Sequence, residues 1–436
     1  MTLTRKLSKL SLWVAVLALT ACEAQADAPG AAGDAGRNAL YSLPNDVIVE
    51  WNEHTIAALV AADGYADPLV ATRVLTLVHL AMHDAVNASA YRVYQSYAFH
   101  ERDRAAHPIA AAAAAAHRVL TGLYETQAAD LSAKLADSLA ALPDGRSRKR
   151  GVALGERAGA ALLEARRNDG SNVNDPYTPG TEPGDYQLTT PNVIARPGWE
   201  KVTPFGLASA AQFRPGPQPV LDSAQYTAAF DEVKSKGAID STTRTAEETE
   251  YARFWYEFSD RGWNRVTNVV ARQESLGLYA TARLFALVNI ALADSYIAGW
   301  DAKFLYDFWR PVTAIRAADT DGNPNTEKAS EWTSFLMTPP VQDYPSTHSV
   351  LGAAAAEVLE RAFGRRGRSI GFSMTSTTAT DPEVERSLES FAHAARENAD
   401  SRVMAGIHFR FSCDAGLEQG KRIGKYVFEN HLQSMR

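Results

Sequence analysis

Apolar residues recur at intervals of three and four over residues 47–163, which is the spacing of an amphipathic helix. One such stretch has apolar side chains at Leu75, Val78, Ala81, Met82, Ala85 and Val86. Residues 109–123 are rich in alanine, whose small side chain favours helix and permits close packing between helices. We therefore expect residues 40–167 to form an N-terminal helical half.

Proline and glycine are frequent in the next stretch, residues 168–218, and no hydrophobic period is sustained there. Proline removes a backbone donor and interrupts helices, so this stretch is predicted to be irregular. We expect residues 168–245 to form a crossover that packs over the surface and rims a pocket. A plain linker between two domains is the alternative interpretation.

Helical spacing resumes at Ala246 and continues through the C-terminal half, residues 246–436. The predicted helices cover residues 247–258, 272–300, 349–363, 381–399 and 416–432. No strand pattern of any length is recognised. The predicted fold is therefore all-α, with two packed helical-bundle halves around one active site.

The first 21 residues are expected to be a lipoprotein signal peptide. A basic segment precedes a short apolar one, which is too short for a transmembrane helix. The apolar segment ends in Leu-Thr-Ala-Cys, which resembles a bacterial lipoprotein box with Cys22 as the lipidated residue. Residues 22–39 would then be a flexible tether, and the protein would be exported to the periplasm or cell envelope, anchored to the outer membrane. An ordinary signal peptide cut near Ala24 or Ala26 is the alternative.

Charge and cysteine content restrict the partners further. The formal net charge is −7, which argues against nucleic acid or an anionic membrane surface as a partner. The chain has two cysteines, Cys22 and Cys413, so lipidation of Cys22 would leave no intrachain disulfide. The membrane would be reached only through the lipid anchor.

Residues able to do chemistry concentrate in three short blocks, at residues 303–311, 344–349 and 401–409. Together the blocks supply three cations, a hydroxyl and two imidazoles: Lys303, Arg310, Arg402, Ser346, His348 and His408. No carboxylate is obligatory in this set, so it suits Mg²⁺, Ca²⁺ or Zn²⁺ poorly. It suits a tetrahedral oxyanion, with one imidazole available as nucleophile or ligand and the other as acid or base.

The spacing inside the blocks predicts local structure. Lys303 and Arg310 are seven residues apart, about two turns, so on a helix they would share a face. The second block reads as a loop entering a helix, whose free N–H groups would point at an anion. Arg402 and His408 are six apart, about 120° on a straight helix, so we expect a bend or a helix start between them at Gly406.

The three blocks read Lys-x6-Arg-Pro, Pro-Ser-Thr-His and Ser-Arg-x5-His. In this order and spacing they resemble the signature shared by vanadium-dependent haloperoxidases and the type 2 phosphatidic acid phosphatase (PAP2) superfamily. Trp300 and the Phe-Trp pair before Arg310 are more similar to the haloperoxidase branch. Residues 77–87 (LVHLAMHDAVN) resemble the early helices of bacterial haloperoxidase-like proteins.

The resemblance implies a vanadate-dependent haloperoxidase that oxidises halide with hydrogen peroxide to hypohalous acid. It implies vanadate as cofactor, with His408 as its axial ligand. The other oxyanion-binding residues that it implies are Lys303, Arg310, Ser346, Thr347 and Arg402. It further implies that His348, His408 and Lys303 are catalytic, with His348 as the acid–base. Trp300 and Val341 match positions that line the halide pocket.

Two positions depart from the family pattern. Thr347 replaces the Gly of Pro-Ser-Gly-His, which keeps the backbone N–H but adds a β-branched side chain. Ser412 stands four residues after His408, where the family often has an Asp that orients the imidazole; the nearest acid in this part of the sequence is Asp414. A serine carries no charge, so the expected basicity of His408 is reduced.

Two further functions fit the same residues. An exported PAP2-type acid phosphatase would use His408 as nucleophile in a phospho-histidine intermediate on a phosphate monoester, with His348 protonating the leaving group. A non-catalytic oxyanion-binding lipoprotein would keep the three cations and lose the chemistry through Thr347 and Ser412.

Overall fold

A computed structural model describes residues 43–89, 93–191 and 193–435 of the chain. Leu43–Arg436 forms one compact unit. The predicted signal peptide, the tether and Cys22 lie outside the described residues.

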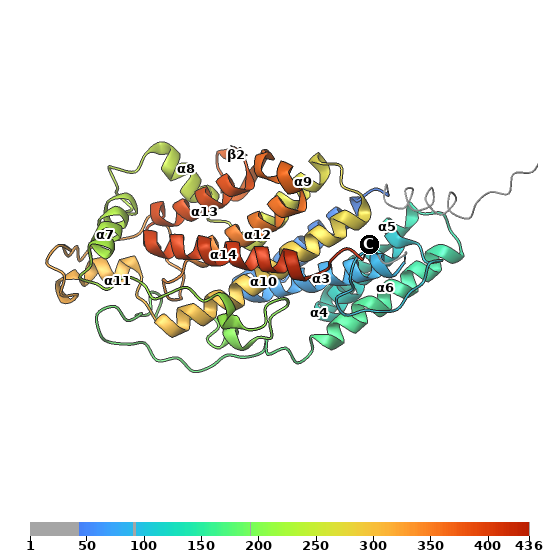
Figure 1. Ribbon diagram of the computed structural model, residues 1–436, viewed down its shortest axis with the longest axis horizontal. Coiled ribbons are helices and arrows are strands. Elements are labelled where there is room, and N and C mark those ends of the chain that lie inside the picture. Colours follow the sequence, from blue (N-terminus) through green and yellow to red (C-terminus); the bar gives the residue numbers. More distant parts are fainter. Residues whose placement is uncertain (1–42, 90–92, 192, 436) are drawn as a thin grey trace, which may run out of the picture. The chain divides into compact units, whose positions relative to one another are not determined.

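The described residues fold mainly into helices, as the sequence predicted. The N-terminal helices are α2 (Asp46–Ala61), α3 (Pro68–Ala88), α4 (Pro108–Leu123), α5 (Ala128–Ala140) and α6 (Arg146–Ala165). The C-terminal helices are α7 (Ala224–Lys236), α8 (Ala246–Phe254), α9 (Ser259–Gln273), α10 (Leu278–Tyr306), α11 (Pro311–Arg316), α12 (Thr347–Ala362), α13 (Phe391–Met404) and α14 (Arg410–Asn430). Figure 1 shows α4, α5 and α6 gathered at one end of this unit and α12, α13 and α14 toward the other.

The long helix α10 joins the two groups, because it packs against α3 on one side and α12 on another. Helices α3 and α10 are long and apolar enough to cross a membrane by length and composition alone. Their most apolar windows are 89% and 94% buried inside the unit, respectively. A helix that is apolar all round belongs in a core, so burial accounts for their composition.

Glycines at every fourth position bring two helix pairs into backbone contact. On α14, three glycines each face a carbonyl oxygen at the start or along the length of α12: Gly416 faces Ser346, Gly420 faces Val350 and Gly424 faces Ala354. A Cβ on Gly420 would lie 2.0 Å from the Val350 oxygen. On α6, the glycines at positions 151, 155 and 159 face carbonyls of the alanine-rich helix α4 in the same way. The first of these pairs fixes how the start of α12, which carries Thr347 and His348 of the predicted site, sits against α14.

The proline-rich crossover is irregular over residues 168–218, apart from two short 3₁₀ turns, η3 (Trp199–Lys201) and η4 (Ala210–Phe213). It follows the unit as the green segment along the lower edge of Figure 1. The buried carboxylate of Asp294 on α10 holds it by accepting the backbone N–H groups of Phe205, Gly206 and Leu207 at 2.6, 2.7 and 2.7 Å. Three such bonds satisfy a carboxylate that would otherwise be costly to bury.

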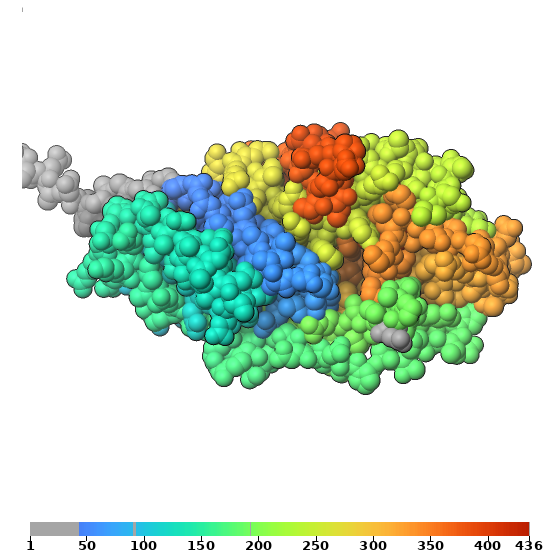
Figure 2. All heavy atoms as spheres, turned by 180° about the vertical axis from the view of Figure 1, so that it is seen from behind, coloured from blue at the N-terminus to red at the C-terminus, as the bar shows by residue number. Residues whose placement is uncertain are grey.

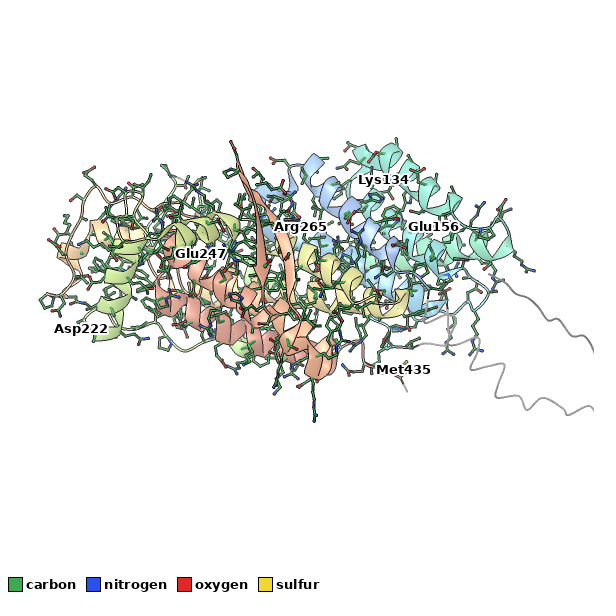
Figure 3. All side chains as sticks on the ribbon, turned by 90° about the horizontal axis from the view of Figure 1, so that it is seen from above. Lys134, Glu156, Asp222, Glu247, Arg265 and Met435 are labelled. Carbon is green, nitrogen blue, oxygen red and sulfur yellow. The ribbon has the colours of Figure 1, made fainter. Side chains whose placement is uncertain are left out.

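One element contradicts the prediction of a fold without strands. Strands β1 (Phe372–Thr380) and β2 (Glu383–Leu388) form an antiparallel hairpin, so the helix predicted at 381–399 begins only at Phe391. The β1 sequence alternates buried and exposed residues and is rich in threonine, which favours strand over helix. Figure 3 shows the hairpin beside Arg265, whose guanidinium donates to the Thr375 hydroxyl at 2.9 Å.

The backbone contact between α12 and α14 predicts that a larger residue at the contact lowers the stability of the protein. Gly420→Ala should lower the free energy of unfolding by about 1–3 kcal/mol, because the new methyl group overlaps the Val350 carbonyl and forces the helices apart. Chemical denaturation followed by circular dichroism measures this. Gly216→Ala is the matched control, since a Cβ there meets nothing within 4 Å. Equal unfolding midpoints for the two variants would contradict the packing argument.

Candidate active site

The first block does not lie on one helix, contrary to the sequence prediction. Helix α10 ends at Tyr306, and Asp307 follows in the left-handed conformation at φ 46°. Arg310 is the N-cap residue of α11, which has proline at its first position. Lys303 and Arg310 therefore approach each other across a chain reversal, and each is only 1% exposed.

The two cations converge because one short segment receives both. The Lys303 ammonium donates to the carbonyl oxygens of Gln342 and Asp343 at 2.6 and 3.0 Å. The Arg310 Nε donates to the carbonyl of Val341 at 2.6 Å. Three successive carbonyls thus hold two buried cations in fixed positions and partly compensate their lost hydration.

The second block enters a helix as predicted, and α12 begins at Thr347 with Ser346 as its N-cap residue. The first N–H groups of a helix have no partner within it, so the start of α12 offers donors to an anion. The Ser346 N–H donates to the Ser412 carbonyl at 2.9 Å, and its hydroxyl accepts from Ser349 at 3.0 Å. His348 Nε2 lies 3.3 Å from the Glu257 carbonyl oxygen.

The third block bends at the predicted place. Helix α13 ends at Met404, Gly406 adopts φ 79°, and α14 begins at Arg410, which leaves His408 in the turn between them. Arg402, near the end of α13, is 1% exposed and donates through Nη1 to the Trp255 carbonyl at 3.1 Å. The turn brings His408 close to the first block, because Arg310 Nη1 lies 3.0 Å from His408 Nε2.

A carboxylate does lie beside His408, and it comes from a residue upstream of the histidine rather than from the positions after it. Asp343 Oδ1 lies 2.9 Å from His408 Nδ1, at ion-pair distance although the N–H is not aligned with the oxygen. Ser412, which stands where the family often has aspartate, donates its hydroxyl to the second oxygen of Asp343. Asp414 is exposed. The acid comes from the segment before α12, and Ser412 positions it.

The site carries more positive than negative charge. Lys303, Arg310 and Arg402 are buried around His408, and Asp343 is the carboxylate that contacts this cluster within the described residues. Burial raises the pKa of Asp343 to about 6, against the opposing effects of Arg310 and the Ser412 hydroxyl, so it is largely ionised at neutral pH.

The pKa directions of the cations reflect the same imbalance. Burial, reinforced by Arg310, lowers the pKa of Lys303 well below its ordinary value. Burial also lowers the pKa of Arg402 to about 10. The pKa of His408 is lowered well below its usual range by burial and then by Arg310, so the imidazole is neutral. An anion bound here would offset each of these shifts.

A cavity of about 610 Å³ leads to this cluster. Its floor includes Arg310, Thr347, His348 and His408. Figure 2 shows the hollow, framed by blue residues of the N-terminal half, green residues of the crossover and orange residues of the loop before α12. Lys303, Ser346 and Arg402 are buried behind this wall and do not line it.

The two residues assigned to the halide pocket both line the cavity. Trp300 donates its indole N–H to the Ala195 carbonyl at 3.1 Å, so the crossover closes over it. Val341 lies on the wall through the segment that also binds Arg310. Residues 193–196 of the crossover contribute to the same wall, as a pocket rim requires.

Sequence reasoning missed Asp343 and most of the cavity wall. Asp343 lies only three residues before Ser346, and a search for acids on both sides of each block would have found it. The aromatic wall residues Tyr65, Tyr256, Phe258 and Tyr296 come from three separate segments. Of these, Tyr296 alone carried a signal, one helical turn before Trp300.

Within the described residues, no group of three or more His, Cys, Asp or Glu side chains could hold a metal ion. The donor set instead fits an oxyanion such as vanadate. Three buried cations and a helix N-terminus supply positive charge, and the neutral His408 lines the cavity with its Nε2 3.0 Å from Arg310 Nη1. Arg402 Nε is buried without a hydrogen-bond partner, so a donor is available at the cluster.

The chain was compared with known proteins. The model of the second helical-bundle domain of vanadium chloroperoxidase (VCPO) matches residues 283–436. Vanadium chloroperoxidase from Curvularia inaequalis is 25% identical over 286 residues, which cover 51% of this chain and 46% of that protein. The chain thus matches about half the length of this curated relative.

Two solved structures match the fold over more of the chain. A bacterial vanadium-dependent iodoperoxidase superimposes with a TM-score of 0.75 at 26% identity, covering 90% of this chain and 99% of that one. A bacterial vanadium-dependent chloroperoxidase in its holo form gives a TM-score of 0.69 at 20% identity, covering 83% and 92%.

Fold and site together define a mainly helical protein in which a cluster of buried cations surrounds a histidine. Together with the matches to the domain model and to these relatives, they support the vanadium haloperoxidase family for this chain.

The role assigned to Asp343 can be tested without an assay of activity. Asp343→Asn should destabilise the oxyanion-free protein by roughly 3–5 kcal/mol, because the cation cluster loses the carboxylate that contacts it. Added orthovanadate should raise the melting temperature of this variant more than that of the parent, since the anion replaces the missing charge. Thermal melts with and without orthovanadate measure both effects, with the exposed Asp414→Asn as control. A variant that melts with the parent would remove Asp343 from its assigned role.

Proposed function

We propose that the protein is a vanadate-dependent haloperoxidase that oxidises a halide with hydrogen peroxide to hypohalous acid. The observation that carries the proposal is the buried excess of positive charge around a neutral imidazole. Lys303, Arg310 and Arg402 surround His408, with Asp343 as the carboxylate in contact with them among the described residues. A stable anion of high charge, tetrahedral and able to accept a nitrogen ligand, matches that arrangement.

His408 would be the ligand through Nε2. Asp343 at Nδ1 favours the tautomer that carries its proton there, which makes Nε2 an acceptor; Arg310 Nη1 lies 3.0 Å from this nitrogen, and the oxyanion would take its place as the partner of Nε2. Lys303, Arg310, Arg402, Ser346 and the N–H groups at Thr347 would hold the oxygens. Bound vanadate would supply a Lewis acid that activates hydrogen peroxide toward attack by halide.

His348 would act as the acid–base. It lines the cavity floor, and its pKa is lowered well below the usual value by burial and then by Arg402, so it begins neutral. A neutral imidazole can accept a proton from incoming hydrogen peroxide and return it to a departing oxygen. Lys303, held on two carbonyls, would keep a positive charge directed at the reacting oxygens. Trp300 and Val341 on the wall would border the halide.

The phosphatase and the non-catalytic binder remain as alternatives that the same experiment separates. Phosphate has the shape and charge of vanadate, so the cation cluster alone does not distinguish the two. The distinction lies in which reactant the loaded or unloaded protein turns over.

The proposal predicts vanadate-dependent halogenation of monochlorodimedone in the presence of hydrogen peroxide and iodide, bromide or chloride. Activity should rise with vanadate loading and be absent from vanadate-free protein, because the residues present hold the oxyanion but supply no Lewis acid to activate hydrogen peroxide. A fully loaded protein that is inactive with all three halides would end the proposal. Turnover of p-nitrophenyl phosphate, inhibited by vanadate and without halogenation, would establish the phosphatase instead, and tight oxyanion binding with neither activity would establish the binder.

Two histidine variants serve as controls in this experiment. His348→Ala should keep vanadate affinity and lose turnover by about 10²- to 10⁴-fold, the usual contribution of a positioned acid–base group. His408→Ala should lose the axial ligand and most activity, although the three cations could still bind the oxyanion. Isothermal titration with orthovanadate separates binding from turnover. Full activity in either variant would overturn the assignment of roles.

We also propose, from the Leu-Thr-Ala-Cys sequence alone, that the protein is an exported lipoprotein anchored through Cys22. Cys22→Ser should move the protein from the membrane fraction to the soluble fraction and abolish incorporation of labelled palmitate, because the thiol is the site of acylation. Fractionation of bacteria that express each form measures this. Soluble, unlabelled parent protein would support the ordinary signal peptide.

A further inference from the structure

The cavity is far larger than the small reactants of the proposed function require. Hydrogen peroxide occupies roughly the space of two water molecules, about 60 Å³, and a halide ion needs no more. The cavity measures about 610 Å³, within the range of pockets that enclose drug-sized organic ligands. Most of its volume is therefore available to another molecule.

The wall of this volume is mainly apolar and aromatic. Its aromatic side chains are Tyr65, Tyr256, Phe258, Tyr296 and Trp300. Two of their polar atoms are already satisfied by the protein, since Trp300 donates to the Ala195 carbonyl and the Tyr256 hydroxyl to the Met337 carbonyl at 2.9 Å. Trp300 and Tyr256 can thus present their rings to a ligand without leaving their own donors unpaired, whereas the buried Tyr65 hydroxyl has no hydrogen-bond partner among the described residues and is available to a polar group of the ligand.

The mouth of the cavity is apolar as well. Val193, Phe258 and Met337 line it and are 43%, 38% and 75% exposed, which makes them three of the eight large hydrophobic side chains that are exposed in the described part of the chain. Phe258 stacks on Tyr65 with 5.5 Å between ring centroids. Charged side chains at the wall neutralise each other, because Asp67 pairs with Arg196. An apolar rim that opens onto an apolar chamber favours entry of an organic molecule.

The floor selects the charge of that molecule. Arg310 lines the floor, and Lys303 and Arg402 are buried directly behind it. The Arg402 guanidinium lies 5.5 Å from the centroid of the Tyr256 ring on the wall. Buried cations repel a cationic ligand and attract the electron-rich face of an arene or an ionised phenol. The occupant should therefore be aromatic and either neutral or anionic.

We propose that this cavity binds a phenol-class aromatic molecule, which receives the oxidised halogen before it leaves the protein. The inference rests on the proposed haloperoxidase function, which supplies the oxidant. Overall, ArH, X⁻, H₂O₂ and H⁺ give ArX and two molecules of water. The O–O bond breaks and accepts two electrons, the C–H bond is replaced by a C–X bond, and the aromatic proton ends in water.

The test uses 1-naphthol as the probe, because its fluorescence reports binding and its two reactive ring positions report where halogenation occurs. The full chain should bind 1-naphthol saturably at one site, with and without vanadate, and should bind 1-naphthylmethylammonium about tenfold more weakly or worse. Ala195→Phe places a ring inside the cavity and should weaken 1-naphthol binding by about tenfold or more. Phe258→Ala, at the half-exposed mouth, removes a wall ring without filling the chamber and should also weaken it.

Val220→Phe is the matched control, since residue 220 is 68% exposed, does not line the cavity, and should leave 1-naphthol affinity unchanged. Halogenation of 1-naphthol by the loaded enzyme should give an ortho-to-para ratio different from that of added hypohalous acid, and Ala195→Phe should move the ratio toward the free reagent. No saturable binding, affinity unaffected by both cavity variants, or a ratio identical to that of the free reagent would overturn the inference. Binding without halide oxidation would support the site and contradict the proposed function, whereas halide oxidation without binding would do the reverse.

Discussion

Burial of three cations around one histidine is the constraint on which the rest of the site depends. Lys303, Arg310 and Arg402 are each 1% exposed, and transferring such groups from water is costly unless they are paired. In this fold, backbone carbonyl oxygens rather than carboxylates accept most of the hydrogen bonds from these cations. Five carbonyls, those of residues 255, 341–343 and 407, receive their N–H groups. Carbonyl dipoles hold the cations without cancelling their charge, so the cluster stays available to an anion.

Among the described residues, the carboxylate in contact with this cluster has a second task besides offsetting part of its charge. Asp343 sits on the far nitrogen of the imidazole and receives the Ser412 hydroxyl on its other oxygen. It therefore favours one tautomer of His408, the one with the proton on Nδ1. The Nε2 side of the ring is left facing the buried cations. The same residue contributes its backbone carbonyl to Lys303, so one position orients the imidazole and anchors a cation. The glycine contact between α12 and α14 holds these groups together. Gly416 lies four residues after Ser412 on α14, and it packs directly on the Ser346 carbonyl at the start of α12.

The sequence supported the convergence of the three blocks and the bend at Gly406, because motif spacing and glycine carry that information locally. It could not supply the path between Lys303 and Arg310, where a left-handed Asp307 turns the chain that spacing alone placed on a helix. Asp343 was missed because the expected acid was sought after His408, whereas space allowed it to come from 65 residues before the histidine. The β-hairpin was missed because charged residues in β2 resemble an amphipathic helix when read without the threonine-rich strand beside them. Trp300, Val341 and the crossover were expected at the pocket and line it, but the other aromatic wall residues could not be predicted, since their segments share no period and meet only in the folded chain.

The apolar wall of the cavity increases the electrostatic effect of the cations at its floor, and wall and cations together restrict which molecules can enter. Side chains such as Trp300 and Tyr256 line the cavity beside the cluster, and the lower local dielectric of such an apolar wall increases the force that each buried cation exerts on an anion or on a polarised oxygen. The chamber also restricts what can approach, because a cation would have to lose its hydration against an apolar wall and meet repulsion at the floor. A neutral or anionic aromatic molecule meets no repulsion at the floor and loses less hydration free energy at the apolar wall. The architecture that concentrates positive charge for the oxyanion thus also determines the chemistry of any organic molecule that shares the cavity with it.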